Sequence, residues 1–192
     1  MTMRPIDLLM RAALSASLGC ACAHSSPPAA AAVTLTPPTV PAALAVPAGA
    51  QVAVRFHAVG AQVYVCGAAP AGGASAYAWT LKRPDATLSD GDGRAVGSHG
   101  AGPTWTSTDG SSVVGKKVAQ ADAPDAAAIP WLLVRAVSTT GAGVFSNVTF
   151  IQRVATANGK APPGGCGADN VATEMRVAYS ADYYFYTGGN GP

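Results

Sequence analysis

Charged residues are scarce in this sequence. Only 11 % of its 192 residues are Asp, Glu, Lys or Arg, and the formal net charge is +2. The basic residues form no cluster larger than the pairs Lys82-Arg83 and Lys116-Lys117. Nucleic-acid binding draws much of its affinity from basic side chains that neutralise phosphates. We therefore expect no nucleic-acid partner.

Helical patterns are also missing. Apart from a weak pattern in residues 119–128, no segment of a dozen residues places apolar side chains every 3.6 positions. The sequence has no internal repeat of fixed period and no Gly-x-Gly-x-x-Gly motif after a predicted strand. These absences exclude the alternating strands and helices of an intracellular dehydrogenase, and we expect no cofactor.

Glycine, proline and alternating apolar residues are abundant instead. The 22 glycines and 15 prolines indicate many turns. Between them, apolar residues alternate with polar ones, which is typical of β-strands. Asp109-Gly110 predicts a type I′ hairpin turn. Strands are predicted at residues 52–56, 61–66, 77–81, 104–108, 111–118, 129–134, 144–154 and 176–186. The predicted fold is all-β: an antiparallel β-sandwich or a partly closed barrel of short strands.

The N-terminal residues resemble an export signal. Arg4 and Arg11 flank a short apolar segment, and Ala21-Cys22-Ala23 fits the small residues at a signal-peptidase site. Residues 1–23 are therefore predicted to be a signal peptide. Ser17-Leu18-Gly19-Cys20 also resembles a bacterial lipobox, which makes Cys20 a lipidation candidate. Both a lipoprotein and a freely secreted protein remain open, so the product is periplasmic, outer-membrane-anchored or extracellular. We expect membrane association only through a lipid anchor.

The segment from His24 to Ala50 contains six prolines and no charged residue. Proline favours extended backbone, so we predict a tether that leads into a single β domain at residues 51–192.

Two cysteines remain after the predicted signal peptide. Cys66 and Cys166 are 100 residues apart, and an exported protein matures under oxidising conditions. A disulfide between them is expected, with two buried free thiols as the alternative.

Seven blocks occur in order between Gln51 and Gly188. They are GAQVYVC, YAWTLKRPDATL, GSHGAGPTW, DGSSVVG, AIPWLL, FSNVTFIQRVAT and YSADYYFY. Together they resemble the family catalogued as domain of unknown function 3455, whose members are exported proteins of bacteria and fungi. The resemblance implies export, but it implies no particular reaction, cofactor or substrate.

A hydrolase-like site is one reading of residues 97–116. His99, Asp109 and Ser111 supply the residue types of a base, an orienting carboxylate and a nucleophile. Ser111, however, lacks the Gly-x-Ser-x-Gly elbow, and a hairpin turn already explains Asp109. The alternative is that His99 and Trp105 pack at the base of the hairpin.

Metal sites have weaker support. His57 and His99 lack a third ligand at a typical spacing. His24 could chelate copper only as a mature N-terminus. Asp90-Gly91-Asp92-Gly93 matches half of a calcium loop, but Arg94 occupies the next ligand position, so a solvated turn is preferred. No metal is expected.

The aromatic residues of the last strand allow two readings. Tyr179, Tyr183 and Phe185 lie on one predicted face, and Tyr184 and Tyr186 lie on the other. Either the strand is buried on both faces, or an exposed aromatic face binds a partner. Trp105, Tyr184 and Tyr186 are the binding candidates.

The main hypothesis is an exported, non-catalytic binding or structural module, whose partner could be a polymer or a protein at the cell envelope. The alternative is an extracytoplasmic, hydrolase-like enzyme with a site around His99, Trp105 and Asp109.

Overall fold

A computed structural model of the chain describes residues 35–71 and 75–189. The predicted signal peptide, Cys20 and His24 lie outside these ranges. The described residues form eight β-strands and two short 3-10 helices. In chain order they are η1 (Ala42–Leu44), β1 (Ala50–Ala68), β2 (Tyr77–Ser89), β3 (Ala95–Gly100), β4 (Thr104–Ser107), β5 (Ser112–Ala121), β6 (Trp131–Thr140), β7 (Phe150–Asn158), η2 (Ala168–Asn170) and β8 (Glu174–Gly188).

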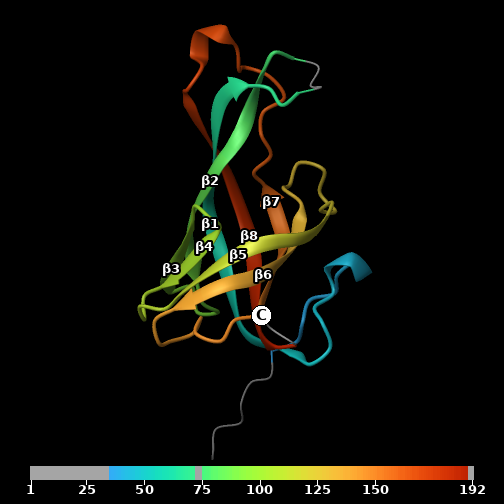
Figure 1. Ribbon diagram of the computed structural model, residues 1–192, viewed down its shortest axis with the longest axis vertical. Coiled ribbons are helices and arrows are strands. Elements are labelled where there is room, and N and C mark those ends of the chain that lie inside the picture. Colours follow the sequence, from blue (N-terminus) through green and yellow to red (C-terminus); the bar gives the residue numbers. More distant parts are fainter. Residues whose placement is uncertain (1–34, 72–74, 190–192) are drawn as a thin grey trace, which may run out of the picture. The chain divides into compact units, whose positions relative to one another are not determined.

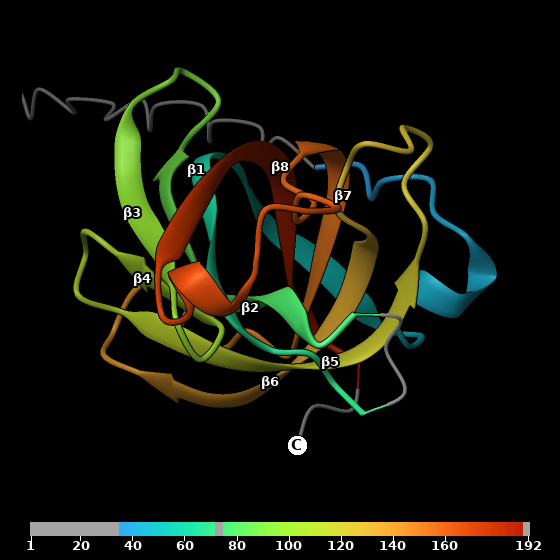
Figure 2. The same ribbon diagram turned by 90° about the horizontal axis from the view of Figure 1, so that it is seen from above.

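The eight strands make one antiparallel sheet that closes on itself. Each strand pairs with the next along the chain, and β8 returns to pair with β1, for example Phe56 with Tyr183. Figure 2 shows this ring end-on. The predicted all-β, antiparallel fold is confirmed. Closure removes the exposed sheet edges that would otherwise pair with other chains.

The inside of the ring is the main core. Alternation in β8 directs Tyr179, Ala181, Tyr183 and Phe185 inward, and all four are buried, as their predicted common face requires. Aromatic side chains from several strands meet there. Phe185, for example, lies 4.7 Å from Phe145 and 6.0 Å from Trp105 between ring centroids. These inward aromatic residues belong to a buried cluster, the inner core.

A second cluster lies on the outside of the ring. Leu44, Leu133, Phe150 and Tyr186 are buried together, and we call them the outer cluster. η1 carries Leu44 and packs beside β5 and β6 (Figure 2). Leu44 has no exposed surface. The tether predicted for residues 24–50 therefore needs correction: the residues around Leu44 pack on the ring and are part of the folded domain.

Two predicted strand boundaries are also wrong. Residues 52–56 and 61–66 belong to one continuous strand, β1. Gly60 allows this, because a Cβ atom there would lie 2.2 Å from the Asp85 carbonyl of the adjacent strand. β2 likewise continues through Pro84. β3 pairs with β2 only from Ala86 to Ser89, so Pro84, which has no N–H, lies where one edge of β2 is unpaired.

The hairpin turn between β4 and β5 differs from the predicted type I′ turn. A type I′ turn needs positive φ at both Asp109 and Gly110, but only Gly110 has it, at 89°. The N–H of Gly110 donates to the Ser107 carbonyl, and the N–H of Ser107 donates to the Ser111 carbonyl. The result is a three-residue loop in which a type I turn is followed by a left-handed glycine. The predicted strand at residues 144–154 begins only at Phe150.

The ends of β1, β2 and β8 extend beyond the ring. β1 and β2 stay paired as far as Ala68 and Tyr77, whereas the pairing of β7 with β8 stops at Asn158 and Tyr179 (Figure 1). The predicted disulfide between Cys66 and Cys166 closes this end, with their Cα atoms 5.4 Å apart.

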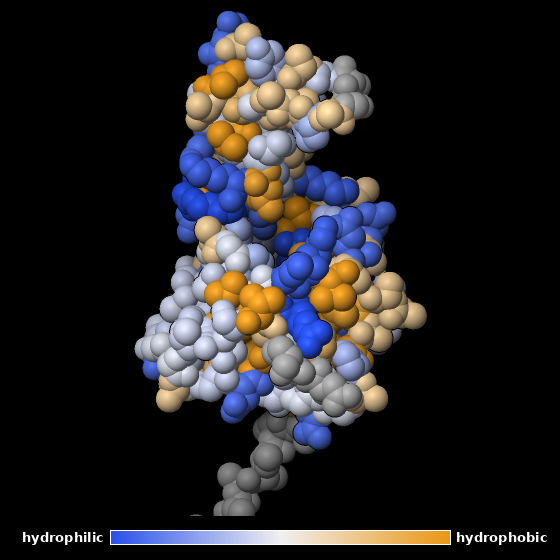
Figure 3. Space-filling view, viewed as in Figure 1, coloured by the Kyte–Doolittle hydropathy of each residue, from blue (hydrophilic) through white to orange (hydrophobic). Residues whose placement is uncertain are grey.

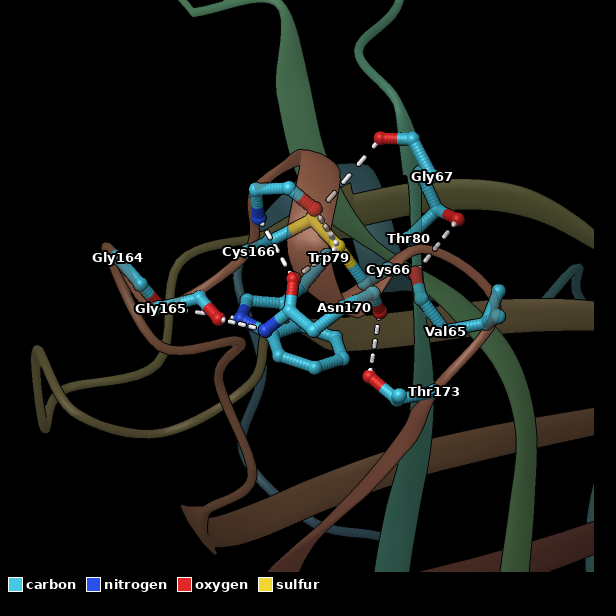
Figure 4. The surroundings of a disulfide bond; sticks show 11 residues. Val65, Cys66, Gly67, Trp79, Thr80, Gly164, Gly165, Cys166, Asn170 and Thr173 are labelled. Carbon is cyan, nitrogen blue, oxygen red and sulfur yellow. Dashed lines mark hydrogen bonds between the residues drawn. A yellow bond between two sulfur atoms is a disulfide. The ribbon is translucent and has the colours of Figure 1, made fainter.

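Further hydrogen bonds hold the chain around the disulfide (Figure 4). The indole N–H of Trp79 donates to the Gly164 carbonyl at 3.0 Å, and the side chain of Asn170 accepts from the N–H of Gly167 at 2.7 Å. The disulfide therefore joins β1 to an ordered loop.

Candidate functional site

A cavity of about 220 Å³ opens into the ring near His99, and we call it the His99 cavity. All eight strands contribute at least one lining residue, and the residues from β3 and β4, His99 and Trp105, form the stacked pair described below. Figure 3 shows a hollow below the projecting strand ends, with hydrophilic residues on both sides of it. The cavity is lined by Gln62, Leu81, Lys82, Arg83, Pro84, His99, Gly102, Pro103, Trp105, Lys117, Leu132, Val134, Arg153 and Tyr183.

Three aromatic rings make one wall of the cavity. His99 and Trp105 are direct partners across β3 and β4, and their rings stack with centroids 4.3 Å apart and planes 7° apart. Tyr183 meets both rings edge-on, at 5.1 Å from His99 and 5.5 Å from Trp105. Edge-to-face and stacked contacts of this kind fix the positions of the rings.

His99 is neutral at physiological pH. Its Nδ1 lies 3.0 Å from the Thr104 carbonyl. A carbonyl only accepts, so Nδ1 carries the proton and Nε2 is left as an acceptor. The side chain is almost fully buried, and loss of hydration lowers its pKa from 6.5 to about 4. The hydrogen bond to the Thr104 carbonyl opposes this lowering of the pKa, and the nearby charge of Arg153 contributes to it.

Several buried polar atoms around the cavity have no hydrogen-bond partner among the described residues. They are Gln62 Nε2, Trp105 Nε1 and the hydroxyls of Tyr179 and Tyr183. An unpaired buried donor costs roughly 1 to 3 kcal/mol, and folded proteins rarely keep one without a reason. Three of these four residues line the same cavity.

The charged residues of the cavity are all basic. Lys82, Arg83, Lys117 and Arg153 line it, and no Asp or Glu among the described residues does. Lys82 pairs with Glu174 at 2.6 Å, and Arg83 pairs with Asp85 at 3.3 Å. Within the described ranges, Lys117 and Arg153 make no salt bridge.

The hydrogen bonds of these two cations go elsewhere. Lys117 donates to the Gln120 side chain, and Arg153 donates to the Pro130 carbonyl through Nε and Nη2. Two positive charges are therefore not neutralised by a carboxylate in the described structure.

The carboxylate of Asp109 accepts hydrogen bonds within and next to the β4–β5 hairpin. Its Oδ1 accepts from the backbone N–H and the hydroxyl of Ser111, and its Oδ2 accepts from the N–H of Val144. These donors hold the pKa of Asp109 far below its ordinary value, with the Ser111 hydroxyl as the largest cause. The Ser111 hydroxyl in turn accepts from the N–H of Phe145. Both side chains tie the hairpin to the loop after β6.

The structure does not join His99 to Asp109. His99 lines the cavity and bonds to Thr104, whereas Asp109 does not line it and bonds to Ser111 and Val144. His99 pairs with Trp105 in the body of the sheet, whereas Asp109 lies in the turn that follows Ser107 at the end of β4. Trp105 is the member of the hydrolase-like set that does lie against His99.

The two outer tyrosines have different surroundings. Tyr186 is fully buried in the outer cluster, and its hydroxyl donates to the Gln152 side chain. Tyr184 is half-buried, and the Arg55 guanidinium lies 5.9 Å from the centre of its ring. Tyr186 therefore offers no surface for a partner.

The remaining candidates stand apart from the cavity. His57 points outward, where its Nδ1 lies 2.8 Å from Asp182, which also binds Arg55. Asp90 accepts from the side chain of Arg94, as a solvated turn would predict. No group of three metal-ligating side chains occurs within the ranges that the structure describes.

The cavity residues that the sequence analysis did not identify include Gln62, Lys117, Arg153 and Tyr183. Gln62 carried a signal, because it is a polar residue in the apolar run of residues 61–66. Arg153 faces inward because it pairs with Tyr183 across β7 and β8. That partnership depends on register, which local alternation does not reveal.

The fold and the cavity define a class of protein: a disulfide-linked, closed antiparallel β domain with an aromatic, cationic cavity inside one end. The chain belongs to the family described as protein of unknown function (DUF3455), whose family model matches residues 47–187. This result confirms the resemblance seen in the sequence. No curated protein and no solved structure matches the chain. Across the described residues, no helix is long and apolar enough to cross a membrane.

Proposed function

We propose that this protein is an exported, non-catalytic binding module and that the His99 cavity is its ligand site. The observation that carries the proposal is that three of the five residues with an unpaired buried polar atom in the described structure line one cavity: Gln62, Trp105 and Tyr183, but not Trp131 or Tyr179. Unsatisfied polar groups lower stability, so their concentration at one place is typical of a site that a ligand completes.

A matched pair of tyrosines tests this site. Tyr183→Phe removes a hydroxyl from the cavity wall, and Tyr184→Phe removes one from the outer face at the next position. A set of neutral, anionic and cationic fragments is screened on the purified full chain by saturation-transfer NMR. We expect binding that Tyr183→Phe weakens and Tyr184→Phe leaves unchanged. If no fragment binds, or if both variants bind like the wild type, the ligand-site proposal is wrong.

The non-catalytic part of the proposal is supported by the surroundings of His99. Its hydrogen-bonded neighbour is a backbone carbonyl, and the carboxylate of Asp109 is bound to Ser111 and Val144 instead. A base in a catalytic triad needs a nucleophile and an orienting group within hydrogen-bond reach. A hydrolase and oxidoreductase screen tests this view. Reproducible turnover that His99→Ala abolishes would support the enzyme alternative with His99, Trp105 and Asp109.

Export is supported by the sequence of residues 1–23 and is compatible with the Cys66–Cys166 disulfide. In this proposal the residues between the signal and the packed segment near Leu44 are a tether, and Cys20 is lipidated or removed with the signal. Membrane fractionation of the wild type and of Cys20→Ala separates these outcomes. A lipoprotein moves from the membrane to the soluble fraction in the variant, whereas a secreted protein does not change. Retention of the uncleaved chain in the cytoplasm would contradict export.

A further inference from the structure

The chemistry of the cavity lining narrows the class of ligand. We infer that the His99 cavity binds a small aromatic carboxylate, with the carboxylate held by Lys117, Arg153 and the unpaired donors. This inference rests on the proposed function, because it assumes that the cavity is the ligand site.

The charge of the lining favours an anion. Its four charged residues are basic, and two of them, Lys117 and Arg153, have no carboxylate partner in the described part of the chain. A ligand carboxylate would pair with them without displacing an existing salt bridge. A cationic ligand would be repelled by the two positive charges of Lys117 and Arg153 in a partly enclosed space, where repulsion is stronger than in bulk water.

The unpaired polar atoms favour a ligand that accepts hydrogen bonds. The indole Nε1 of Trp105 and the amide Nε2 of Gln62 can only donate. The Tyr183 hydroxyl can donate as well. A carboxylate offers two oxygens with about four acceptor positions, so one group could satisfy several of these donors.

The size and the walls of the cavity favour a small, apolar body. The cavity volume of about 220 Å³ is below the roughly 300 to 1,000 Å³ of sites for drug-sized molecules. Besides the stacked rings, its walls include apolar side chains: Leu81, Pro84, Pro103, Leu132 and Val134. An aromatic ring would pack against the His99–Trp105 stack and Tyr183, as aromatic groups do in proteins.

Neighbouring lysines provide a matched pair of variants. Lys117 lines the cavity, whereas Lys116 does not. Both side chains are exposed, so replacement of either by methionine keeps the apolar stem and removes one charge. Lys117→Met tests the contribution of the cavity charge, and Lys116→Met controls for the change in net charge.

Benzoate, benzamide and benzamidine are suitable probes because they have almost the same shape and differ in charge. Each is titrated into the purified full chain at pH 7, and the dissociation constant is measured by calorimetry. We expect benzoate to bind at least about tenfold more tightly than benzamide and benzamidine not to bind. Lys117→Met should weaken benzoate binding about tenfold, the effect of one charge-assisted hydrogen bond, and Lys116→Met should leave it unchanged.

The outcomes separate this inference from the proposed function. If benzamide or benzamidine binds as tightly as benzoate and Tyr183→Phe weakens that binding, the cavity is a ligand site but the anion inference is wrong. If inorganic phosphate displaces benzoate and binds equally well, the site selects only for negative charge, and the inference that the ligand carries an aromatic ring is wrong. If the lysine variants do not differ, Lys117 does not hold the carboxylate. If no fragment of any charge binds, both proposals fail.

Discussion

Two buried glutamines have opposite surroundings in this protein. Gln152, in contact with the outer cluster, accepts from the Tyr186 hydroxyl and donates to the Leu44 carbonyl at 2.6 Å. Gln62, on the inner side of the ring, has an amide nitrogen without a partner in the described residues, and the nearby Tyr183 hydroxyl is unpaired as well. Both glutamines are almost completely buried.

The difference separates a region that stabilises the fold from a region that is open to a ligand. In the outer cluster, η1 supplies the carbonyl that completes the hydrogen bonds of Gln152. At the His99 cavity none of the described residues does the same for the amide nitrogen of Gln62. A buried amide contributes to stability only when it is paired, so the two glutamines should respond differently to the same substitution.

The largest effect is expected from Leu44→Ala, which removes the side chain that seals the outer cluster. Leu44 is fully buried, and truncation of such a leucine costs about 2 to 5 kcal/mol of unfolding free energy. Urea denaturation followed by circular dichroism measures the change. Val59→Ala, at an exposed apolar residue, is the control and should change stability by less than about 0.5 kcal/mol. An equally small effect of Leu44→Ala would mean that the N-terminal segment does not pack on the ring.

Acid should destabilise the cavity region through His99. Burial holds the pKa of His99 at about 4, below the 6.5 of an exposed histidine, so the unfolded chain binds the proton more tightly. The contribution of neutral His99 to the free energy of unfolding is fully present above about pH 6.5. It decreases by about 3 kcal/mol as the pH falls towards 4.

The variant His99→Phe keeps an aromatic ring against Trp105 and removes the titration. Its unfolding free energy should change less than that of the wild type between pH 6.5 and 4. Tyr183, which lies edge-on to His99, stays neutral over this range because burial raises its pKa. Equal pH dependence in the two proteins would show that His99 titrates normally and is hydrated.

Gln152→Met should be clearly destabilising, by about 2 kcal/mol. It leaves the Tyr186 hydroxyl and the Leu44 carbonyl without their partners inside the outer cluster. Burial already raises the pKa of Tyr186 to about 12. Ultraviolet titration of the tyrosines provides a second readout, because loss of the Gln152 partner changes the environment of this hydroxyl.

Gln62→Met should have the smallest effect on stability: we expect no loss of unfolding free energy, and a gain of up to about 1 kcal/mol. The substitution removes a buried donor that has no partner among the described residues and keeps a similar volume. Denaturation of Gln62→Met and Gln152→Met under the same conditions gives the comparison directly. If both variants lose the same stability, Gln62 is paired in solution and the contrast between the two regions does not exist.

The strands and their faces were largely predictable from the sequence. Alternation identified the inward face of β8, since Tyr179, Ala181, Tyr183 and Phe185 follow a period of two. The boundaries predicted at Gly60 and Pro84 were wrong, because neither residue interrupts its strand. At Gly60 the backbone of β2 comes too close for a side chain, and Pro84 lies where one edge of β2 is unpaired and needs no N–H donor. Neither the approach of β2 to Gly60 nor the unpaired edge at Pro84 can be predicted from the turn-forming residues alone.

The candidate site was only partly predictable. His99 and Trp105 stood out as the residues of their hairpin that turn chemistry did not explain, and they lie together at the cavity. Asp109 carried a functional residue type, but its hydrogen bonds are structural. Lys117 and Arg153 had no local signal, because a single basic residue in a strand is ordinary until its face is known.

By itself, the sequence determined the all-β class, the family and the pair of cysteines that form the disulfide. These follow from local alternation, ordered blocks and cysteine number. Only the tertiary structure decided that the sheet closes, that Leu44 seals its outside and that Gln62, Lys117, Arg153 and Tyr183 line one cavity with His99. The physical reason is that closure and strand register bring together residues that are far apart in the chain, and neither is encoded in the alternation of any one strand.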